Sequence, residues 1–209
     1  MCTKGFSVKV FNCEQRSDEW YKIRSGIITA SAARNVLTPS LRNEYMYKLI
    51  SEILTGQSEV IETNQHMQWG IEYEEEARQW YVEKTGNEVE EIGFAISDFN
   101  AGIGCSPDGL VGDDGLIEIK CPMSKTHIKY VMTGPKAEYI QQMQFQMLVT
   151  GRKWCDFVTY DPRMPESARG AVHRIARDEQ MLWKMVSCLT KMQKTMKDFL
   201  SDHGVDYDY

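Results

Sequence analysis

The chain has 209 residues and a mass of 24.1 kDa, and 42% of its residues are apolar and 26% charged. This size and composition predict a globular, soluble protein with a sizeable core, which we interpret as a single domain over residues 1–209 with peripheral N-terminal and C-terminal ends. The formal net charge of -6 and the pI of about 5.3 argue against a protein that coats nucleic acid, which would be basic overall, but they do not exclude an enzyme with a local basic groove.

Helices are predicted in the N-terminal part of the chain. Residues 17–26 (SDEWYKIRSG) combine a capping serine, acids in the first turn and a terminal glycine. A second helix is expected to begin within ITASAARNVL, capped by Thr29 or Ser31. Residues 42–55 carry apolar side chains at helical spacing and are followed by a glycine.

Residues 70–85 predict a further amphipathic helix that contains an inward carboxylate. Tyr73, Ala77 and Tyr81 define its apolar face, and Glu74 falls on or beside that face. A carboxylate directed into a protein must be paired, hydrogen-bonded or bound to a metal. Glu74 is therefore a candidate site residue.

The centre of the chain predicts β-structure. Residues 89–97 (VEEIGFAIS) and 115–120 (GLIEIK) have strand character, and the tetrapeptide GDDG is typical of a turn. Side chains alternate between the two faces of a strand, so Glu118 and Lys120 share one face and the flanking isoleucines the other. Asp108 begins the partner strand, and the hairpin can bring its carboxylate beside that of Glu118.

The C-terminal part predicts helices and strands in alternation. Residues 136–150 form an amphipathic pattern in which Gln144 lies within the apolar stripe. Residues 154–160 (WCDFVTY) and 173–177 (HRIAR) are interpreted as strands, and a long helix is expected over about residues 178–200, followed by a frayed acidic tail. The whole order predicts an α/β fold in which helices cover the faces of a mixed sheet.

The cysteines and the distribution of apolar residues indicate the setting. No stretch is long and apolar enough to span a bilayer, and the N-terminus MCTKGFSVKVFNCEQ lacks the apolar core of a signal peptide, so we expect a cytoplasmic protein. None of the 6 cysteines forms a C-x-x-C pair, which disfavours a structural zinc site. We expect free thiols packed as small apolar groups.

Two carboxylates at the mouth of the central hairpin can bind a hard divalent cation. Mg²⁺ prefers oxygen ligands, keeps several waters and is commonly held by one or two carboxylates together with substrate phosphate. The backbone carbonyl of Ile119, between Glu118 and Lys120, is a further oxygen donor. The lysine lies one strand repeat, roughly 7 Å, beyond the glutamate, where its ammonium can orient water or offset phosphate charge. Glu74 and Gln144 could complete the pocket from neighbouring helices.

A simpler interpretation of the same residues is a solvated polar hairpin. Glu118 and Lys120 would then form a surface ion pair worth under about 1 kcal/mol. The basic stretch over residues 121–137, which contains no acid, is likewise typical of a solvated face. The isoleucines on the other face of the strand favour the functional interpretation, because they indicate a central strand with the acid and lysine directed to a cleft.

The motifs and their order resemble those of a known nuclease family. Proline-aspartate, a gap and then Glu-x-Lys is similar to the motif of the PD-(D/E)xK nuclease superfamily. More specifically, the chain resembles the phage λ exonuclease family of YqaJ-like viral recombination nucleases. The resemblance implies a restriction-endonuclease-like core, with a central mixed β-sheet flanked by α-helices. Six segments between Glu19 and Met164 carry it in the family's order: EWYKIRSGIITAS, WGIEYEEEAR, CSPDGL, LIEIKCP, QMQFQMLVT and YDPRM.

The family resemblance implies a metal-dependent deoxyribonuclease. Members degrade one strand of linear duplex DNA processively in the 5′→3′ direction with Mg²⁺, releasing mononucleotides and leaving a 3′ single strand for an annealing partner. Two Mg²⁺ ions per active site are implied, with Mn²⁺ able to substitute. The resemblance also implies a ring-shaped homotrimer around DNA, a single-strand annealing recombinase as partner, and a phage or prophage gene in a bacterial host.

Carried over residue by residue, the resemblance implies two sets of site residues. The catalytic set consists of metal ligands, a water-positioning lysine and two helical residues: Asp108, Glu118 and the Ile119 carbonyl, Lys120, Glu74 as a possible further metal ligand, and Gln144. The second set would bind the 5′-phosphate and the DNA end: Arg24, Ser31, Ser106, Lys125, Thr126 and Met67, the last as a wedge against the terminal base pair. Thr126 departs from the family, which has an arginine there, and the adjacent Lys125 offers a point charge but not the same fork. Arg24 also fits a solvated helix position, and Met67 fits ordinary core packing.

Two other functions remain open from the sequence. The same fold could be a structure-specific or sequence-specific DNA endonuclease. Alternatively, the protein could be a non-catalytic DNA-end clamp that serves the annealing protein. The full acidic set disfavours the clamp, because a binding module has no need of two carboxylates that face a polyanion.

Overall fold

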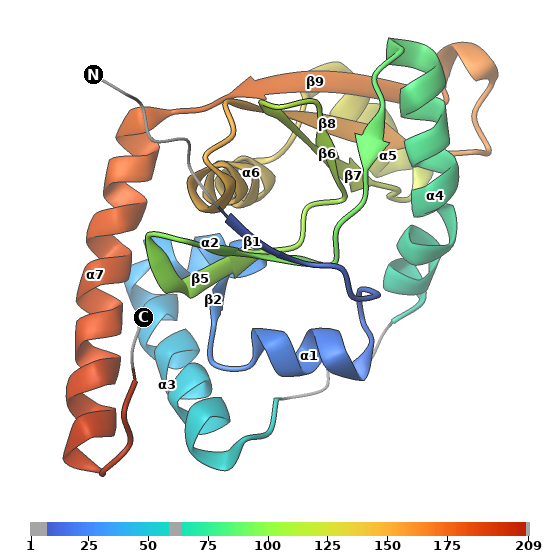
Figure 1. Cartoon of the computed structure of the whole chain (residues 1–209). Helices are drawn as coiled ribbons and strands as arrows, with labels where there is room; N and C mark the ends of the chain where they lie inside the picture. The colour runs from blue at the N-terminus through green and yellow to red at the C-terminus, as the bar shows by residue number, and fades with distance from the viewer. Residues whose placement is uncertain (1–7, 59–63, 208–209) are drawn as a thin grey trace.

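The computed structural model describes residues 8–58 and 64–207, which form two β-sheets packed with helices (Figure 1). One sheet has 5 strands in the order β3-β6-β7-β8-β9, and the other has 4 in the order β1-β4-β5-β2. Both are mixed, because β8 runs parallel to β7 and β2 parallel to β5, while the remaining pairs are antiparallel. The strands are β1 (Val8–Phe11), β2 (Ile28–Thr29), β3 (Val89–Glu90), β4 (Phe94–Ser97), β5 (Asn100–Cys105), β6 (Gly109–Val111), β7 (Gly115–Lys120), β8 (Trp154–Tyr160) and β9 (Gly170–Ala176).

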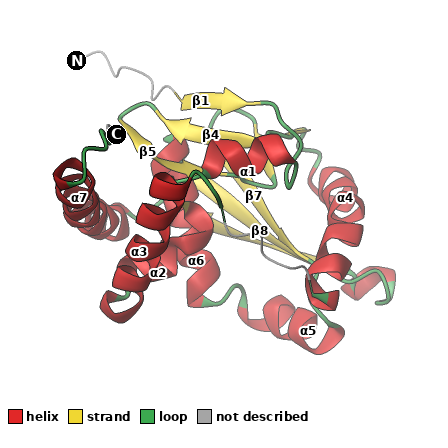
Figure 2. Cartoon of the chain, turned by 90° about the horizontal axis from the view of Figure 1, so that it is seen from below, coloured by secondary structure: helices red, strands yellow, loops and turns green. Residues whose placement is uncertain are grey.

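Helices cover the sheets and also lie between them, as the α/β prediction required. In both views α4 and α7 lie at opposite sides of the molecule (Figures 1 and 2). Short 3-10 turns occur at η1 (Ala30–Ala32) and η2 (Glu166–Ala168). The α-helices of the described chain are α1 (Asp18–Arg24), α2 (Ala33–Leu37), α3 (Pro39–Thr55), α4 (Gln65–Thr85), α5 (Ser124–Thr133), α6 (Ala137–Thr150) and α7 (Glu179–Asp202). The predicted architecture of a mixed sheet flanked by helices is confirmed.

The two faces of β7 belong to two different apolar clusters. Helix α6 contacts strands of both sheets, and all of its residues over 143–150 are buried. Leu116 packs in the larger cluster with α6, whereas Ile117 and Ile119 pack in the smaller cluster with α4. The predicted alternation along β7 is therefore confirmed. It places Glu118 on the α6 side of the sheet.

Caps explain where the helices next to the site begin. The hydroxyl of Ser17 accepts a hydrogen bond from Trp20 N (3.2 Å), which is the predicted cap of α1. Helix α4 begins at residue 65 rather than 70, because the Asn64 side chain accepts a hydrogen bond from Met67 N (3.0 Å) and caps a longer helix. Met67 consequently lies in the first turn of α4.

Other segments differ from the expectation. Residues 124–133 form α5, although their basic composition was interpreted only as a solvated face. The C-terminal tail does not fray throughout: Val205 and Tyr207 pack against the larger cluster, because burial of these two apolar side chains is favourable in spite of the acids around them. The tail residues 208–209 lie outside the described residues.

The expected free thiols are confirmed for the described cysteines: Cys13, Cys105, Cys121, Cys155 and Cys188. Cys2 lies outside the described residues. Within residues 8–58 and 64–207, every helix is too short or too polar to cross a membrane.

Candidate active site

The hairpin of β6 and β7 brings the two predicted carboxylates to one end of the larger sheet. Asp108 immediately precedes β6, and its N–H donates to Ile117 O (3.2 Å). Its side-chain Oδ2 accepts a hydrogen bond from Ile119 N (2.6 Å). The carboxylate of Asp108 is thereby fixed at the edge of the strand that carries Glu118.

Glu118 is only 1% exposed, and its carboxylate is surrounded by donors. Oε1 accepts hydrogen bonds from Lys120 Nζ and from Gln142 Nε2 (2.6 Å for the glutamine), and Oε2 accepts one from Gln146 Nε2 (2.7 Å). A buried carboxylate is tolerated when it is paired and hydrogen-bonded in this way. Helix α6 thus holds Glu118 from the face of the sheet opposite to α4.

Burial and like charge make this group of residues electrostatically unusual. Burial raises the pKa of Asp108 well above its usual range, and the neighbouring Glu118 carboxylate raises it further. Burial by itself would lower the pKa of Lys120, but the carboxylates of Glu118 and Asp108 outweigh this effect and raise it. Two desolvated carboxylates that repel each other form a place where a cation is favourable.

The oxygen donors fit a hard divalent cation. Carbonyls along a strand point to the same edge at every second residue. The Ile119 carbonyl therefore points to the same edge of β7 as the Ile117 carbonyl, which accepts the hydrogen bond from Asp108 N. In the described part of the chain no three His, Cys, Asp or Glu side chains converge as a metal cluster. Two carboxylates and a carbonyl nevertheless suit Mg²⁺, which keeps several of its waters.

An open cleft of about 550 Å³ lies beside this hairpin. It is lined by residues from α4, the end of β7 and the segment after it, the starts of α5 and α6, and the turn before α1. Five predicted site residues share it: Glu74, Ile119, Lys120, Met67 and Thr126. Met67 is 42% exposed, so it is not the core side chain that the alternative interpretation expected.

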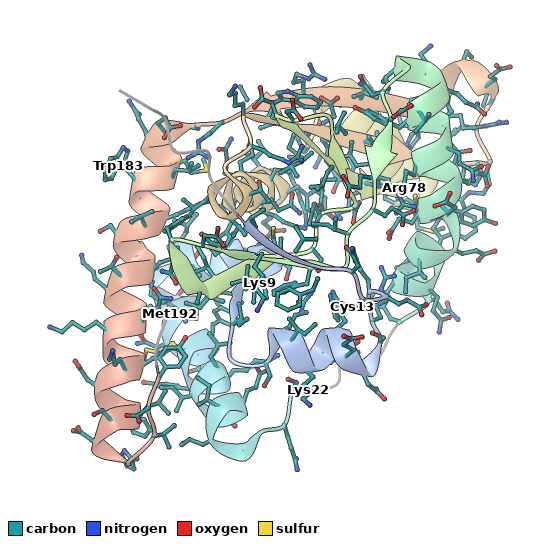
Figure 3. The ribbon with its side chains drawn as sticks, viewed as in Figure 1. Lys9, Cys13, Lys22, Arg78, Trp183 and Met192 are labelled. Carbon is teal, nitrogen blue, oxygen red and sulfur yellow. The ribbon has the colours of Figure 1, made fainter. Side chains whose placement is uncertain are left out.

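Glu74 reaches the cleft from α4, where two arginines hold it. Its Oε2 accepts a hydrogen bond from Arg16 Nη2 (3.3 Å) and its Oε1 accepts one from Arg78 Nη2 (3.4 Å). Arg78 also donates from Nε to the Asp108 carbonyl oxygen (3.1 Å), and Figure 3 shows it on α4 beside the strands. Arg78 therefore connects the Glu74 carboxylate of α4 to the main chain of the hairpin through hydrogen bonds.

The expectation that Gln144 completes the pocket is wrong. Its Nε2 donates to Ala176 O (2.7 Å), and its Oε1 accepts a hydrogen bond from Asp178 N (2.8 Å). The side chain therefore connects α6 to the segment between β9 and α7. The glutamines that touch Glu118 are Gln142 and Gln146, which lie four residues apart and share one helix face.

The predicted phosphate-binding residues do not share one site. Arg24 and Ser31 line a separate cavity of about 260 Å³. Arg24 lies 3.6 Å over the Trp20 ring, and burial lowers its pKa to about 10. Ser106 accepts a hydrogen bond from Trp20 Nε1 (2.9 Å) and donates to Gly93 O (2.7 Å), so Trp20 lies between Ser106 and Arg24.

Two details of this predicted set differ from the expectation. Ser31 lies within the 3-10 turn η1 rather than at an α-helix N-terminus, because α2 begins only at Ala33. Lys125 is exposed on α5, and Thr126 beside it is the residue that lines the cleft. Lys125 therefore does not take the place of the missing arginine in the cleft wall.

Sequence reasoning missed four residues of the site: Arg16, Arg78, Gln142 and Gln146. The two glutamines lie four residues apart, but that spacing does not show which side of the helix faces Glu118. Arg78 follows Glu74 at the same spacing, which is typical of a helical ion pair. No comparable pattern marks Arg16.

Comparison with known proteins gives a consistent result. The family model described as a YqaJ-like viral recombinase domain matches residues 19–153. An alkaline exonuclease from Laribacter hongkongensis is 43% identical, with a TM-score of 0.80 over 90% of this chain and 98% of that one, and it has also been solved in complex with dAMP with the same agreement. A phage-related exonuclease from Haemophilus somnus shares the fold at 16% identity, with a TM-score of 0.64 over 85% of this chain and 96% of its own. No curated protein matches the chain.

Proposed function

Because the chain belongs to the YqaJ-like viral recombinase family, we propose that it is a metal-dependent deoxyribonuclease that degrades linear double-stranded DNA as an exonuclease. The observation that carries this proposal is the meeting of Asp108, Glu118 and Lys120 at one end of a hairpin beside an open cleft. The likeness to an alkaline exonuclease over 90% of the chain supports the same class of reaction.

The residues of the hairpin have separate roles in this proposal. Asp108, Glu118 and the Ile119 carbonyl would hold Mg²⁺. The family resemblance implies two ions per site, with Mn²⁺ able to substitute. The chemistry that Mg²⁺ supplies when bound is Lewis acidity toward phosphate oxygens. Lys120 places a cationic donor on the cleft wall, where it orients water or offsets charge on the phosphate. The amides of α6 fix the orientation of Glu118.

The finer features of the reaction are proposed from the family resemblance. We infer processive 5′→3′ degradation that releases mononucleotides and leaves a 3′ single strand for an annealing recombinase. The cavity that contains Arg24 and Ser31 supports recognition of a 5′-phosphate, because a guanidinium and a hydroxyl are both suited to that group. We also propose a ring-shaped homotrimer, encoded by a phage or prophage and acting in the bacterial cytoplasm.

The proposal is tested by incubating the protein with Mg²⁺ and four DNA substrates. These are linear duplex with a 5′-phosphate, linear duplex with a 5′-hydroxyl, the same duplex labelled at its 3′ ends, and covalently closed circles. We expect mononucleotides from the linear substrates, faster loss of the 5′-phosphorylated strand, and retention of the 3′ label until late in the reaction.

Each alternative gives a different result in the same experiment. Cleavage of closed circles would indicate an endonuclease of the same fold. Binding of linear ends at high protein concentration without any degradation would indicate an end clamp. A protein that sediments as a monomer at working concentration would contradict the trimer, and the cleavage results would still stand.

A further inference from the structure

The turn before α1 holds Arg16 in a backbone conformation that side chains rarely adopt. Arg16 has a φ of 72°, and it is the non-glycine residue with positive φ among the described residues. It is the third residue of a turn closed by the hydrogen bond from Ser17 N to Glu14 O (3.2 Å), a position at which positive φ favours glycine or asparagine. An arginine in this conformation is destabilising by itself, which makes its side chain a candidate for a functional role.

Neighbouring contacts fix this turn against the active-site hairpin. The side-chain Nε2 of Gln15 donates to Ile92 O (3.2 Å) and to Pro107 O (3.3 Å), the residue directly before Asp108. On the other side of the turn, Ser17 begins α1 as its cap. Arg16 is therefore held at a defined place relative to the site, on a short rigid turn.

The guanidinium of Arg16 is only lightly engaged. Its side chain is 41% exposed, and its ion pair is a single contact from Nη2 to Glu74 Oε2 at 3.3 Å. The other oxygen of Glu74 is already paired with Arg78, whose side chain is 10% exposed and which also bonds to Glu75 and Glu91. Arg78 thus stabilises the charge of Glu74 from within the fold, and the exposed contact from Arg16 is not required for that purpose.

Arg16 is also the arginine that the cleft presents to a ligand. Among the described residues that line the cleft, the lysine and arginine side chains are Lys120 and Arg16. Lys120 is paired with the buried Glu118 carboxylate. A guanidinium can bind a phosphate through two parallel hydrogen bonds, and it remains charged at any working pH.

We propose that Arg16 binds a backbone phosphate of the DNA strand that occupies the cleft, and that it leaves its single contact with Glu74 to do so. The inference rests on the proposed nuclease function and adds a substrate-binding residue to it. The rigid turn keeps the position of the arginine backbone fixed, so the phosphate contact also sets how far the strand enters toward Lys120.

The test uses the full chain with Arg16→Gly and Arg16→Lys, and with Arg34→Ala as the control. Arg34 is an exposed, ion-paired arginine that does not line the cleft. We expect Arg16→Gly to raise KM for linear duplex roughly tenfold with kcat changed by less than about twofold. The slope of log Kd against log salt, measured without divalent metal, should fall by about one. Arg16→Lys should keep the wild-type salt slope, because lysine carries the same charge. It should bind duplex more tightly than Arg16→Gly but less tightly than the wild type, because lysine cannot form the two parallel hydrogen bonds of a guanidinium.

Thermal unfolding separates a binding role from a structural one. Glycine fits the positive φ, so Arg16→Gly should melt at the same temperature as the wild type or higher. A lower melting temperature, or an unchanged KM and salt slope, would overturn the inference. If the wild type binds duplex without degrading it, the proposed function fails, and the salt slope of Arg16→Gly still decides whether Arg16 contacts phosphate.

Discussion

Replacing Gln146 by leucine tests which glutamine of α6 supports the active site. Gln146 is fully buried and donates to Glu118 Oε2 at 2.7 Å. A hydrogen bond to a charged group contributes about 1.5–3 kcal/mol. Part of this loss is offset, because Gln146 Oε1 is buried without a partner and the substitution removes that unsatisfied oxygen. We therefore expect Gln146→Leu to lower the free energy of unfolding by about 1–2 kcal/mol.

The effect on catalysis should be larger than the effect on stability. Glu118 keeps the hydrogen bonds from Lys120 and Gln142, so the carboxylate stays in place but turns more freely. Loss of a residue that orients a metal ligand typically costs about 10–100-fold in metal affinity or activity. The Mg²⁺ concentration for half-maximal hydrolysis should rise within that range.

Gln144→Leu is the matched control, because it removes the same side chain from the same buried helix. It removes the hydrogen bonds to the Ala176 carbonyl and from the Asp178 N–H, so its free energy of unfolding should fall by about 1–3 kcal/mol. Its Mg²⁺ dependence should match the wild type. Stability is measured by urea unfolding. Hydrolysis of linear duplex is measured under conditions in which both variants are fully folded. A shifted Mg²⁺ dependence in Gln144→Leu, with none in Gln146→Leu, would refute the assignment.

Three further predictions concern catalysis, a buried histidine and pH. Lys120→Ala should abolish hydrolysis, because it removes a cation from the cleft wall. Filter binding of duplex ends should stay intact, because the substitution leaves β7 in place. His127 is fully buried, and its ring nitrogens hydrogen-bond to Thr159 Oγ1 (2.9 Å) and to the Ala168 carbonyl of η2 (2.9 Å). His127→Phe should therefore lower the free energy of unfolding in urea by about 2–4 kcal/mol, and a loss of under about 1 kcal/mol would contradict this. Burial opposes ionisation of Asp161, but hydrogen bonds from Arg163 outweigh it and lower its pKa to about 2. The ionised Asp161 therefore stabilises the folded protein above the usual pKa of an aspartate, and this stabilisation is lost as pH falls toward 2. In urea titrations from pH 5 to pH 2.5, the difference in free energy of unfolding between the wild type and Asp161→Asn should narrow. A constant difference would contradict this.

The hairpin could be predicted because its geometry is local. The turn and the strand alternation fix where Asp108, Glu118 and Lys120 lie relative to one another, and both are determined by residues within a short segment. Ile117 and Ile119 then fix which face is apolar. The family resemblance adds roles to these residues, but it was not needed to bring them together.

The choice among the glutamines could not be predicted in the same way. Successive helix residues are rotated by about 100°, so the face a glutamine presents depends on how the helix is turned about its axis. An apolar stripe normally reveals that orientation. In α6 every residue over 143–150 is buried, because the helix contacts both sheets, and no single stripe marks the side that faces Glu118.

Arg16 was missed for a different reason. Its position depends on a turn whose conformation favours glycine, so local propensity argues against the turn that forms. The contacts that impose the turn reach across the chain, from Gln15 to residues 92 and 107. Long-range contacts of this kind override local preference, and they leave no periodic pattern in the sequence.

The two hairpin carboxylates are held differently, and this difference indicates how the site is balanced. Glu118 is buried under α6 and accepts hydrogen bonds from Lys120 and two side-chain amides, so the protein itself compensates its charge. In the described chain the carboxylate of Asp108 accepts a hydrogen bond from Ile119 N, and burial together with the Glu118 charge raises its pKa. A desolvated anion with few donors is unfavourable. Asp108 is also the more exposed of the two, so a cation can reach its carboxylate more easily than that of Glu118. The fold therefore fixes the Glu118 carboxylate with several hydrogen bonds and leaves the Asp108 carboxylate with fewer donors, which is the arrangement that the proposed cation would stabilise.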